Sequence, residues 1–151
     1  FPPLRNKKDT KAIYDALIEN KIDIISSHHS PQDQDSKRLP FEQAEFGIIG
    51  FETLLPISLD LHINGKMKII KLIDKLTNQP AKLLNLNTGK IAINSPADLT
   101  LIDIKTSNVL KLENMNSKSN NSLFDEYETK GKILCTIVDG RIVYTDQKFN
   151  L

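Results

Sequence analysis

The chain has little cysteine, no long hydrophobic run and no excess of charge of either sign among its 151 residues. Cys135 is the single cysteine, so it has no disulfide partner, and we expect a reduced, buried thiol of a cytoplasmic protein. The formal net charge is +1 with acidic and basic residues interspersed, which argues against a nucleic-acid partner. No apolar run approaches the roughly 20 residues of a membrane-spanning helix, so we expect no membrane partner either.

The amino-acid composition is typical of a soluble globular protein, with 39% hydrophobic and 26% charged residues. The chain begins "FPPLR", without methionine and without a signal-peptide pattern. We therefore expect Phe1 to follow an earlier part of a longer polypeptide.

The first 86 residues predict alternating helices and strand. Asp9 or Thr10 can cap a helix that runs to residue 18, and Ile22–Ser26 reads as a short, buried parallel strand. The polar stretch Ser30–Pro40 is expected to be a loop at the carboxyl end of this strand, where barrels and open α/β sheets place their chemistry. Three helices follow, over residues 47–66, 67–76 and 77–86.

The first of these three helices contains Pro56, for which we expect a kink, and ends at Asn64 and Gly65.

The sequence pattern then changes to one of short strands, within residues 89–104 and 131–146, with turns at Asn94-Ser95-Pro96 and Asp139-Gly140. An Asn/Ser-rich stretch between them, residues 111–130, reads as an exposed loop. We accordingly divide the chain into an α/β part, residues 1–86, and a β part, residues 87–151.

The order of the motifs "PPLR", "IDIISSHHSPQ", "FGIIGFET", "TNQPAKLLNL", "GKIAINSPADLTLID" and "TIVDGRIVY" resembles the C-terminal part of bacterial dihydroorotases, members of the amidohydrolase superfamily. The resemblance spans nearly the whole chain. "PADLTLID" and "TIVDGRIVY" are shared by many amidohydrolases, whereas "PPLR" together with "GIIGFETLLP" is closer to dihydroorotase.

The resemblance implies a (β/α)₈ barrel with one or two zinc ions at the carboxyl ends of its strands, and a small β-sandwich. Residues 1–86 would supply the last strand and helices of the barrel, and residues 87–151 part of the composite sandwich. The implied reaction is the reversible ring closure of carbamoyl-aspartate to dihydroorotate in pyrimidine biosynthesis. The early His-x-His pair, the carboxylated lysine and two further histidines of the family are not among residues 1–151, so we expect this chain to need the N-terminal portion of the same protein.

His28 is the candidate catalytic and metal-binding residue. The family typically has Thr-Asp-His-Ala-Pro-His where this chain has Ser27–Gln32, so His28 stands at the position of the Asp that ligates zinc and shuttles the proton. A carboxylate can bind the metal through one oxygen and take a proton with the other, whereas the two nitrogens of an imidazole diverge. His28 can still ligate zinc as a neutral imidazole but is a poor substitute for the base.

Two candidate substrate-binding positions are also altered. Gln32 replaces a family histidine, and Phe1 replaces an Asn that binds polar substrate groups, which an aromatic ring would leave unpaired. Arg5 and the "FGIIG" motif keep the family pattern, although Glu45 stands where the family often has Pro. We therefore predict a dihydroorotase-family protein that is impaired at the catalytic step. Zinc is the cofactor of the family, and its absence from this protein is left open.

Three alternatives stay open at this point. The protein is an active zinc hydrolase, a non-catalytic scaffold that supports aspartate transcarbamoylase, or a hydrolase of a different cyclic amide. A homodimer is a further assembly that the sequence leaves open.

Other polar residues have simpler interpretations. His28 and His29 are neighbours, so on a strand they point to opposite faces, and the family register assigns His28 to the barrel mouth. The "DQDSK" run at residues 33–37 reads as a solvated loop, although Lys37 and Arg38 can meet an acidic substrate or partner. Structural roles are expected for the remaining candidates: Glu52, His62, Asp98 and Cys135.

Overall fold

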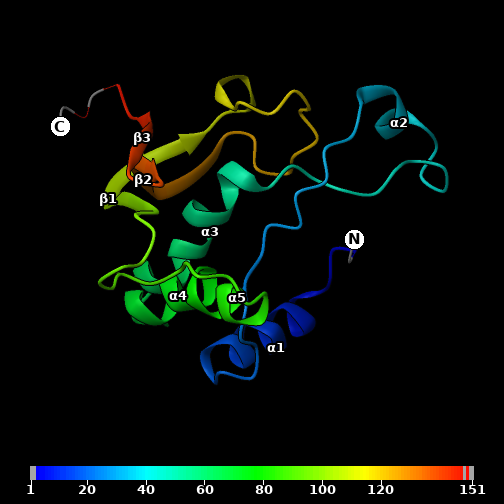
Figure 1. Cartoon of the computed structure of the whole chain (residues 1–151). Coiled ribbons are helices and arrows are strands. Elements are labelled where there is room, and N and C mark those ends of the chain that lie inside the picture. Colours follow the sequence, from blue (N-terminus) through cyan, green and yellow to red (C-terminus); the bar gives the residue numbers. More distant parts are fainter. Residues whose placement is uncertain (1–2, 148, 150–151) are drawn as a thin grey trace.

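A computed structural model describes residues 3–147 and residue 149 (Figure 1). The helices come first: α1 (Lys7–Ile18), α2 (Gln34–Arg38), α3 (Phe51–Ile63), α4 (Ile69–Leu76) and α5 (Asn78–Leu83). The strands β1 (Leu99–Leu110), β2 (Tyr127–Val138) and β3 (Arg141–Thr145) follow, with a 3₁₀ turn, η1 (Leu112–Asn114), between the first two.

Local signals place α3, α4 and α5 within the residue ranges that the sequence predicts for helices, whereas α1 has a different cap. The side chain of Asn6 accepts hydrogen bonds from the N–H groups of Lys8 and Asp9, so the helix begins before the predicted caps, Asp9 and Thr10. The C-terminal end of α3 and the start of α5 match the prediction, whereas α5 ends at Leu83 instead of residue 86. Asn64 ends α3, and Thr77 precedes α5, which carries Pro80 in its first turn.

The predicted strand Ile22–Ser26 is wrong as regular secondary structure, because the described residues form no parallel neighbour for it. The segment is tied instead to the end of α4, since the N–H of Ile25 donates to the carbonyl of Lys75 (3.1 Å). The Lys75 side chain is 4% exposed and its Nζ donates to the carbonyl of Ile22. A strand is defined by its partners, and this one lacks them among the described residues.

Four further predictions need correction. The loop Ser30–Pro40 contains α2, which Asp33 caps by accepting the N–H of Ser36 (2.8 Å). Residues 47–50 precede α3 instead of belonging to it, and residues 90–94 before the turn form no strand. The predicted exposed loop is shorter than 111–130, because β2 begins at Tyr127.

The sheet is antiparallel with strand order β1-β2-β3. Asp139 and Gly140 both have positive φ and form the predicted β2–β3 turn. Between the pairs Asp103–Lys132 and Ser107–Lys130 the register shifts, so that three residues of β1 bulge opposite Gly131 of β2.

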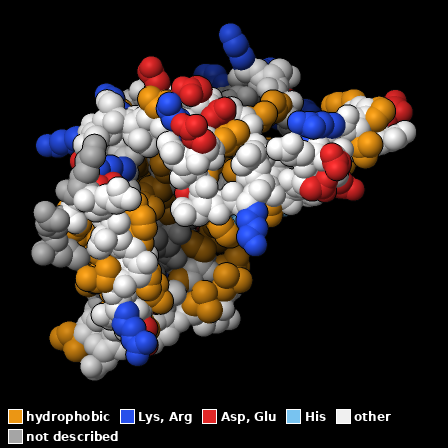
Figure 2. All heavy atoms as spheres, turned by 90° about the horizontal axis from the view of Figure 1, so that it is seen from above, with side chains coloured by type: hydrophobic (Ala, Val, Ile, Leu, Met, Phe, Trp, Pro, Cys, Tyr) orange, Lys and Arg blue, Asp and Glu red, His pale blue; other side chains and the backbone are white. Residues whose placement is uncertain are grey.

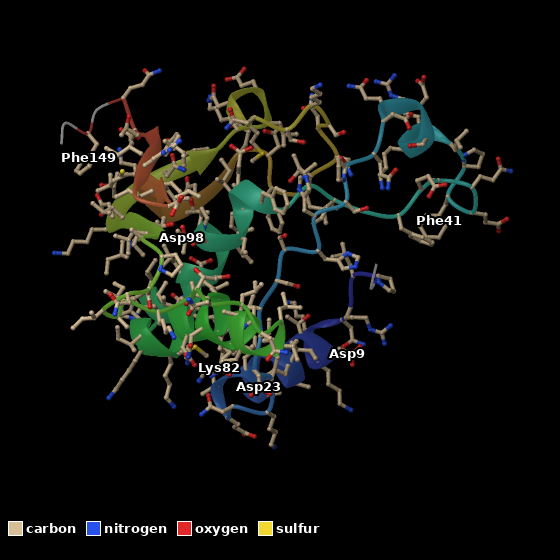
Figure 3. All side chains as sticks on the ribbon, viewed as in Figure 1. Asp9, Asp23, Phe41, Lys82, Asp98 and Phe149 are labelled. Carbon is tan, nitrogen blue, oxygen red and sulfur yellow. The ribbon has the colours of Figure 1, made fainter. Side chains whose placement is uncertain are left out.

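The core lies where α3 and α4 meet this bulge. Leu59 and Leu72 are fully buried, Leu61 and Met67 nearly so, and Ile104 of β1 packs against them. Much apolar surface stays exposed elsewhere. Figure 2 shows hydrophobic side chains around a recess and at the tip of a projecting arm. Phe41, on the arm beyond α2 (Figure 3), is 96% exposed.

Candidate functional site

The segment Ser27–Gln32 lies against the "FGIIG" motif that precedes α3. The N–H of Ser30 donates to the carbonyl of Ile48 (2.9 Å). Gly47 has a φ of +124°, and a Cβ there would lie 2.5 Å from Ser30 Oγ and 2.7 Å from the Ser30 carbonyl oxygen. The motif therefore needs glycine at residue 47 because of the backbone conformation and of the close approach of the two segments.

His29 is fixed by two contacts from the start of α3. Its Nδ1 accepts the N–H of Gly50 at 3.0 Å, and its ring stacks on Phe51 with centroids 3.9 Å apart and planes 10° apart. Because Nδ1 accepts, the neutral ring carries its proton on Nε2. Sequence reasoning assigned no role to this residue, yet it anchors the segment that carries the candidate site.

A cleft of about 270 Å³ lies beside this stack, lined in part by His29, Phe51, Glu52 and Asn116. Glu52 is exposed, and its two carboxylate oxygens accept the main-chain N–H (2.8 Å) and the side-chain Nδ2 (3.1 Å) of Asn116. The sequence predicts a buried polar or capping role for Glu52, whereas the residue is exposed and instead ties the β1–β2 loop to α3.

His28 is exposed and has a φ of +47°, a left-handed conformation that is uncommon outside glycine. The chain turns at this residue, so His28 and His29 do not follow the alternation of a strand. His29, not His28, lines the described cleft.

The residues present do not fit a zinc ion by themselves. Over residues 3–147 and 149, no group of three or more His, Cys, Asp or Glu side chains lies close enough to hold a metal. A protein zinc site takes three or four such ligands, and His28 would supply one. We therefore derive no catalytic step through a metal from this chain alone.

Of the two predicted substrate-binding residues, the structure describes Gln32 but not Phe1. The Nε2 of Gln32 donates within the site segment itself, to Ser30 Oγ (3.3 Å), and also to the carbonyl of Phe46 (3.0 Å). Phe1 lies outside the described residues. Arg5, which keeps the family pattern, is exposed and its Nε donates to Asp9 (3.0 Å).

The "DQDSK" run has a structural explanation in place of a solvated loop. The N–H and hydroxyl of Ser36 hold the pKa of the Asp33 carboxyl below its ordinary value. Lys37 donates from Nζ to the carbonyls of Glu45 (2.8 Å) and Gly47 (3.3 Å). These contacts join α2 to residues 45 and 47, at the start of the "FGIIG" motif beside the site.

The structural roles predicted for three further residues are confirmed. Asp98 accepts the N–H of Asp139 (2.9 Å) and the hydroxyl of Thr88 (3.2 Å), so it joins the start of β1 to the β2–β3 turn. His62 lies at the end of α3 with Nδ1 3.0 Å from the carbonyl of Met67, and Cys135 is fully buried.

Asn121 is the site residue that the sequence did not reveal. It lies in the Asn/Ser-rich stretch, whose composition is typical of an exposed loop. Its Nδ2 nevertheless donates to the carbonyls of Ser30 (3.0 Å) and Gly47 (3.1 Å), and its Oδ1 accepts the N–H of Gln32 (3.2 Å). No local pattern could have indicated contacts with residues so far earlier in the chain.

The arrangement of site segment, helices and antiparallel sheet is that of the C-terminal part of an amidohydrolase barrel and its β-sandwich, as the sequence predicts. It superposes on the D-hydantoinase (dihydropyrimidinase) of Thermus sp. with a TM-score of 0.89 at 27% identity, over 99% of this chain and 34% of that one. The dihydropyrimidinase of Brevibacillus agri gives a TM-score of 0.92 at 23% identity, covering 98% and 34%, and supports the fold alone.

The family model described as "Amidohydrolase family" matches residues 1–143, so the chain belongs to the amidohydrolase family. Among its curated relatives, the dihydroorotase of Wolbachia sp. subsp. Drosophila simulans is 41% identical over 146 residues, which cover 97% of this chain and 33% of the relative. The dihydroorotase of Ehrlichia chaffeensis is 41% identical over 143 residues, covering 95% and 32%. The chain thus spans about a third of the length of these relatives. Within the described residues, no helix has the length and apolar character needed to cross a bilayer.

Proposed function

We propose that this chain is the C-terminal third of a dihydroorotase-type cyclic amide hydrolase of pyrimidine biosynthesis, impaired at the catalytic step. The 41% identity to dihydroorotases over nearly the whole chain is the observation that supports the substrate class. The impairment rests on His28, an imidazole where the family carries a carboxylate.

The physical argument concerns proton transfer. The second oxygen of a metal-bound carboxylate stays beside the attacking water and can take its proton, whereas the second nitrogen of a metal-bound imidazole points away from it. A missing general base typically costs a factor of about 10²–10⁴ in rate. The loss of one negative charge also weakens the hold on a zinc ion, whose other ligands must come from outside residues 1–151.

The exposed apolar surface supports a requirement for further polypeptide. Ile142, Val143 and Tyr144 on β3 are 47–61% exposed, and β3 is an edge strand of the sheet. We assign this surface to the N-terminal portion of the same protein. Aspartate transcarbamoylase and a second copy of the chain are the competing occupants, and cytoplasmic location is part of the proposal.

The test joins this chain to the N-terminal two-thirds of the Wolbachia dihydroorotase, which supplies the missing length. Hydrolysis of dihydroorotate is measured for the chimera, for His28→Asp and for the matched control His28→Asn, which has nearly the shape of Asp but no carboxylate. We expect the His28→Asp change to raise kcat by roughly 10²–10⁴ and the His28→Asn change to leave it low.

Zinc content is measured on the same samples. Equal rates for the unchanged chimera and for His28→Asp, with zinc bound in both, would show that histidine serves as well as aspartate and refute the impairment. Hydrolysis of hydantoin in place of dihydroorotate by the His28→Asp chimera would assign the protein to a different cyclic amide.

A further inference from the structure

Asn121 joins segments that lie far apart in the sequence, although it belongs to the loop between β1 and β2. Its side chain contacts Ser30, Gln32 and Gly47 by the three hydrogen bonds given above. Its main-chain carbonyl accepts the N–H of Ile49 at 2.9 Å. One residue therefore binds both the site segment and the motif that supports it.

The chemistry of these contacts requires an amide at residue 121. Both N–H bonds of Nδ2 donate to carbonyl oxygens, and Oδ1 accepts an N–H, so the side chain supplies two donors and one acceptor in a half-buried position. An aspartate of the same shape would place a carboxylate oxygen against the carbonyls of Ser30 and Gly47. Alanine would leave those carbonyls and one N–H without their partner.

The contacts fall on both sides of Pro31. Because proline has no N–H, the backbone between Ser30 and Gln32 has no donor of its own that could fix it. Asn121 accepts the first N–H after the proline and donates to the carbonyl just before it. The path of the chain over Ser30–Gln32, which follows His29, is thus fixed in part by a residue from a different part of the fold.

We propose that Asn121 is a positioning residue for the site segment Ser27–Gln32, holding residue 28 in register with the other site groups. The proposal rests on the proposed function for its catalytic consequence. The fixing of the backbone does not depend on that function, so the two can fail separately.

Backbone fixing is tested by amide hydrogen exchange in the chimera described above, which contains all 151 residues of this chain. Asn121→Ala is compared with Asn120→Ala, a matched control because Asn120 is exposed and adjacent. We expect exchange at the N–H of Gln32 to become about tenfold faster in Asn121→Ala, the effect of losing one intramolecular hydrogen bond. The buried N–H of Leu72 in α4, bonded to the carbonyl of Lys68, should keep its rate.

Two results would overturn the proposal. Unchanged exchange at Gln32 would mean that Asn121 does not fix the segment. Equal acceleration at Gln32 and Leu72 would mean that Asn121 only supports global stability. Asn121→Asp gives a second variant of native shape. It keeps an oxygen that can accept the N–H of Gln32 but loses both donors, so we expect a smaller acceleration at Gln32 than in Asn121→Ala.

Positioning is separated from simple support by steady-state kinetics in the chimera that carries His28→Asp. Adding Asn121→Ala should lower kcat by about a hundredfold with KM within about threefold, because misplacing a catalytic group by about 1 Å slows the reaction itself. Unchanged kcat would overturn the proposal. An inactive His28→Asp chimera would instead refute the proposed function, and the exchange result would then decide the role of Asn121 alone.

Discussion

Replacing Gly131 with alanine should destabilise the protein by more than the usual cost of an alanine at a glycine position. Gly131 lies in β2 opposite the bulge of β1 and has a φ of +93°. A Cβ there would lie 2.4 Å from Cδ1 of Leu59 and 3.0 Å from the carbonyl oxygen of Asp103. Leu59 is fully buried in the core between α3 and α4, so its side chain cannot swing out into solvent.

Two contributions add up to the expected loss of stability in Gly131→Ala. Holding a non-glycine residue in this part of backbone conformational space costs about 1–3 kcal/mol. Forcing an extra methyl group into a packed core costs about another 1–3 kcal/mol. The free energy of unfolding, measured by urea titration with circular dichroism, should therefore fall by about 2–6 kcal/mol. A single domain has a total stability of about 5–15 kcal/mol, so the variant should be visibly less stable.

Gly65→Ala separates the two contributions. Gly65 also has positive φ, +68°, but nothing lies within 4 Å of a Cβ there, so the control reports backbone strain without a clash. In addition, the double variant Leu59→Ala/Gly131→Ala should lose less stability than the sum of the two single changes, because the smaller side chain makes room for the methyl group. The reasoning is refuted if Gly131→Ala costs no more than Gly65→Ala and the double variant is additive.

Three further outcomes follow from particular contacts. The amides of Gln79 and Asn78 hold the pKa of Asp74 below its ordinary value of 3.8, so the stability gained from them is fully present above that pH and lost as the pH falls through the lower folded pKa. Urea titrations at several pH values should therefore show that the deficit of Asp74→Asn is constant near neutral pH and shrinks in acid; a deficit that persists unchanged in acid contradicts this. Gly47→Ala should lower the free energy of unfolding by about 2–4 kcal/mol through its clash with the Ser30 backbone, and thermal denaturation should show a lower melting temperature. An unchanged melting temperature would count against this clash. Cys135 should react with a maleimide, followed by mass spectrometry, far faster in denaturant than in buffer, because the thiol is fully buried; rapid labelling of the folded chain would disprove that.

The catalytic prediction and the positioning of the site segment are linked through one stretch of chain. The exposed, left-handed backbone at His28 leaves room for a carboxylate side chain without repacking. The structure therefore predicts that His28→Asp changes the stability of the fold little, so that its effect on activity can be measured separately.

Much of the secondary structure was readable because it depends on neighbouring residues. The end of α3 follows from Asn64-Gly65 and the start of α5 from Thr77 with Pro80, and the β2–β3 turn follows from Asp139-Gly140. Each of these signals acts within one turn of the backbone, so the sequence alone determines it. The resemblance in motif order led to the family in the same way, since it needs only the order of residues along the chain.

The tertiary structure decided what depends on residues distant in sequence. Ile22–Ser26 has the composition of a buried strand, but a strand forms only beside a partner, and here the segment is bonded to the end of α4. His29 is fixed by Gly50 and Phe51, and the site segment by Asn121, whose loop has no composition that distinguishes it from a solvated one. Local sequence determined where the chain turns and which faces are apolar. Only packing decided how the site is held, because it brings amide donors within 3.0 Å of a carbonyl oxygen and an imidazole nitrogen that lie far away in the sequence.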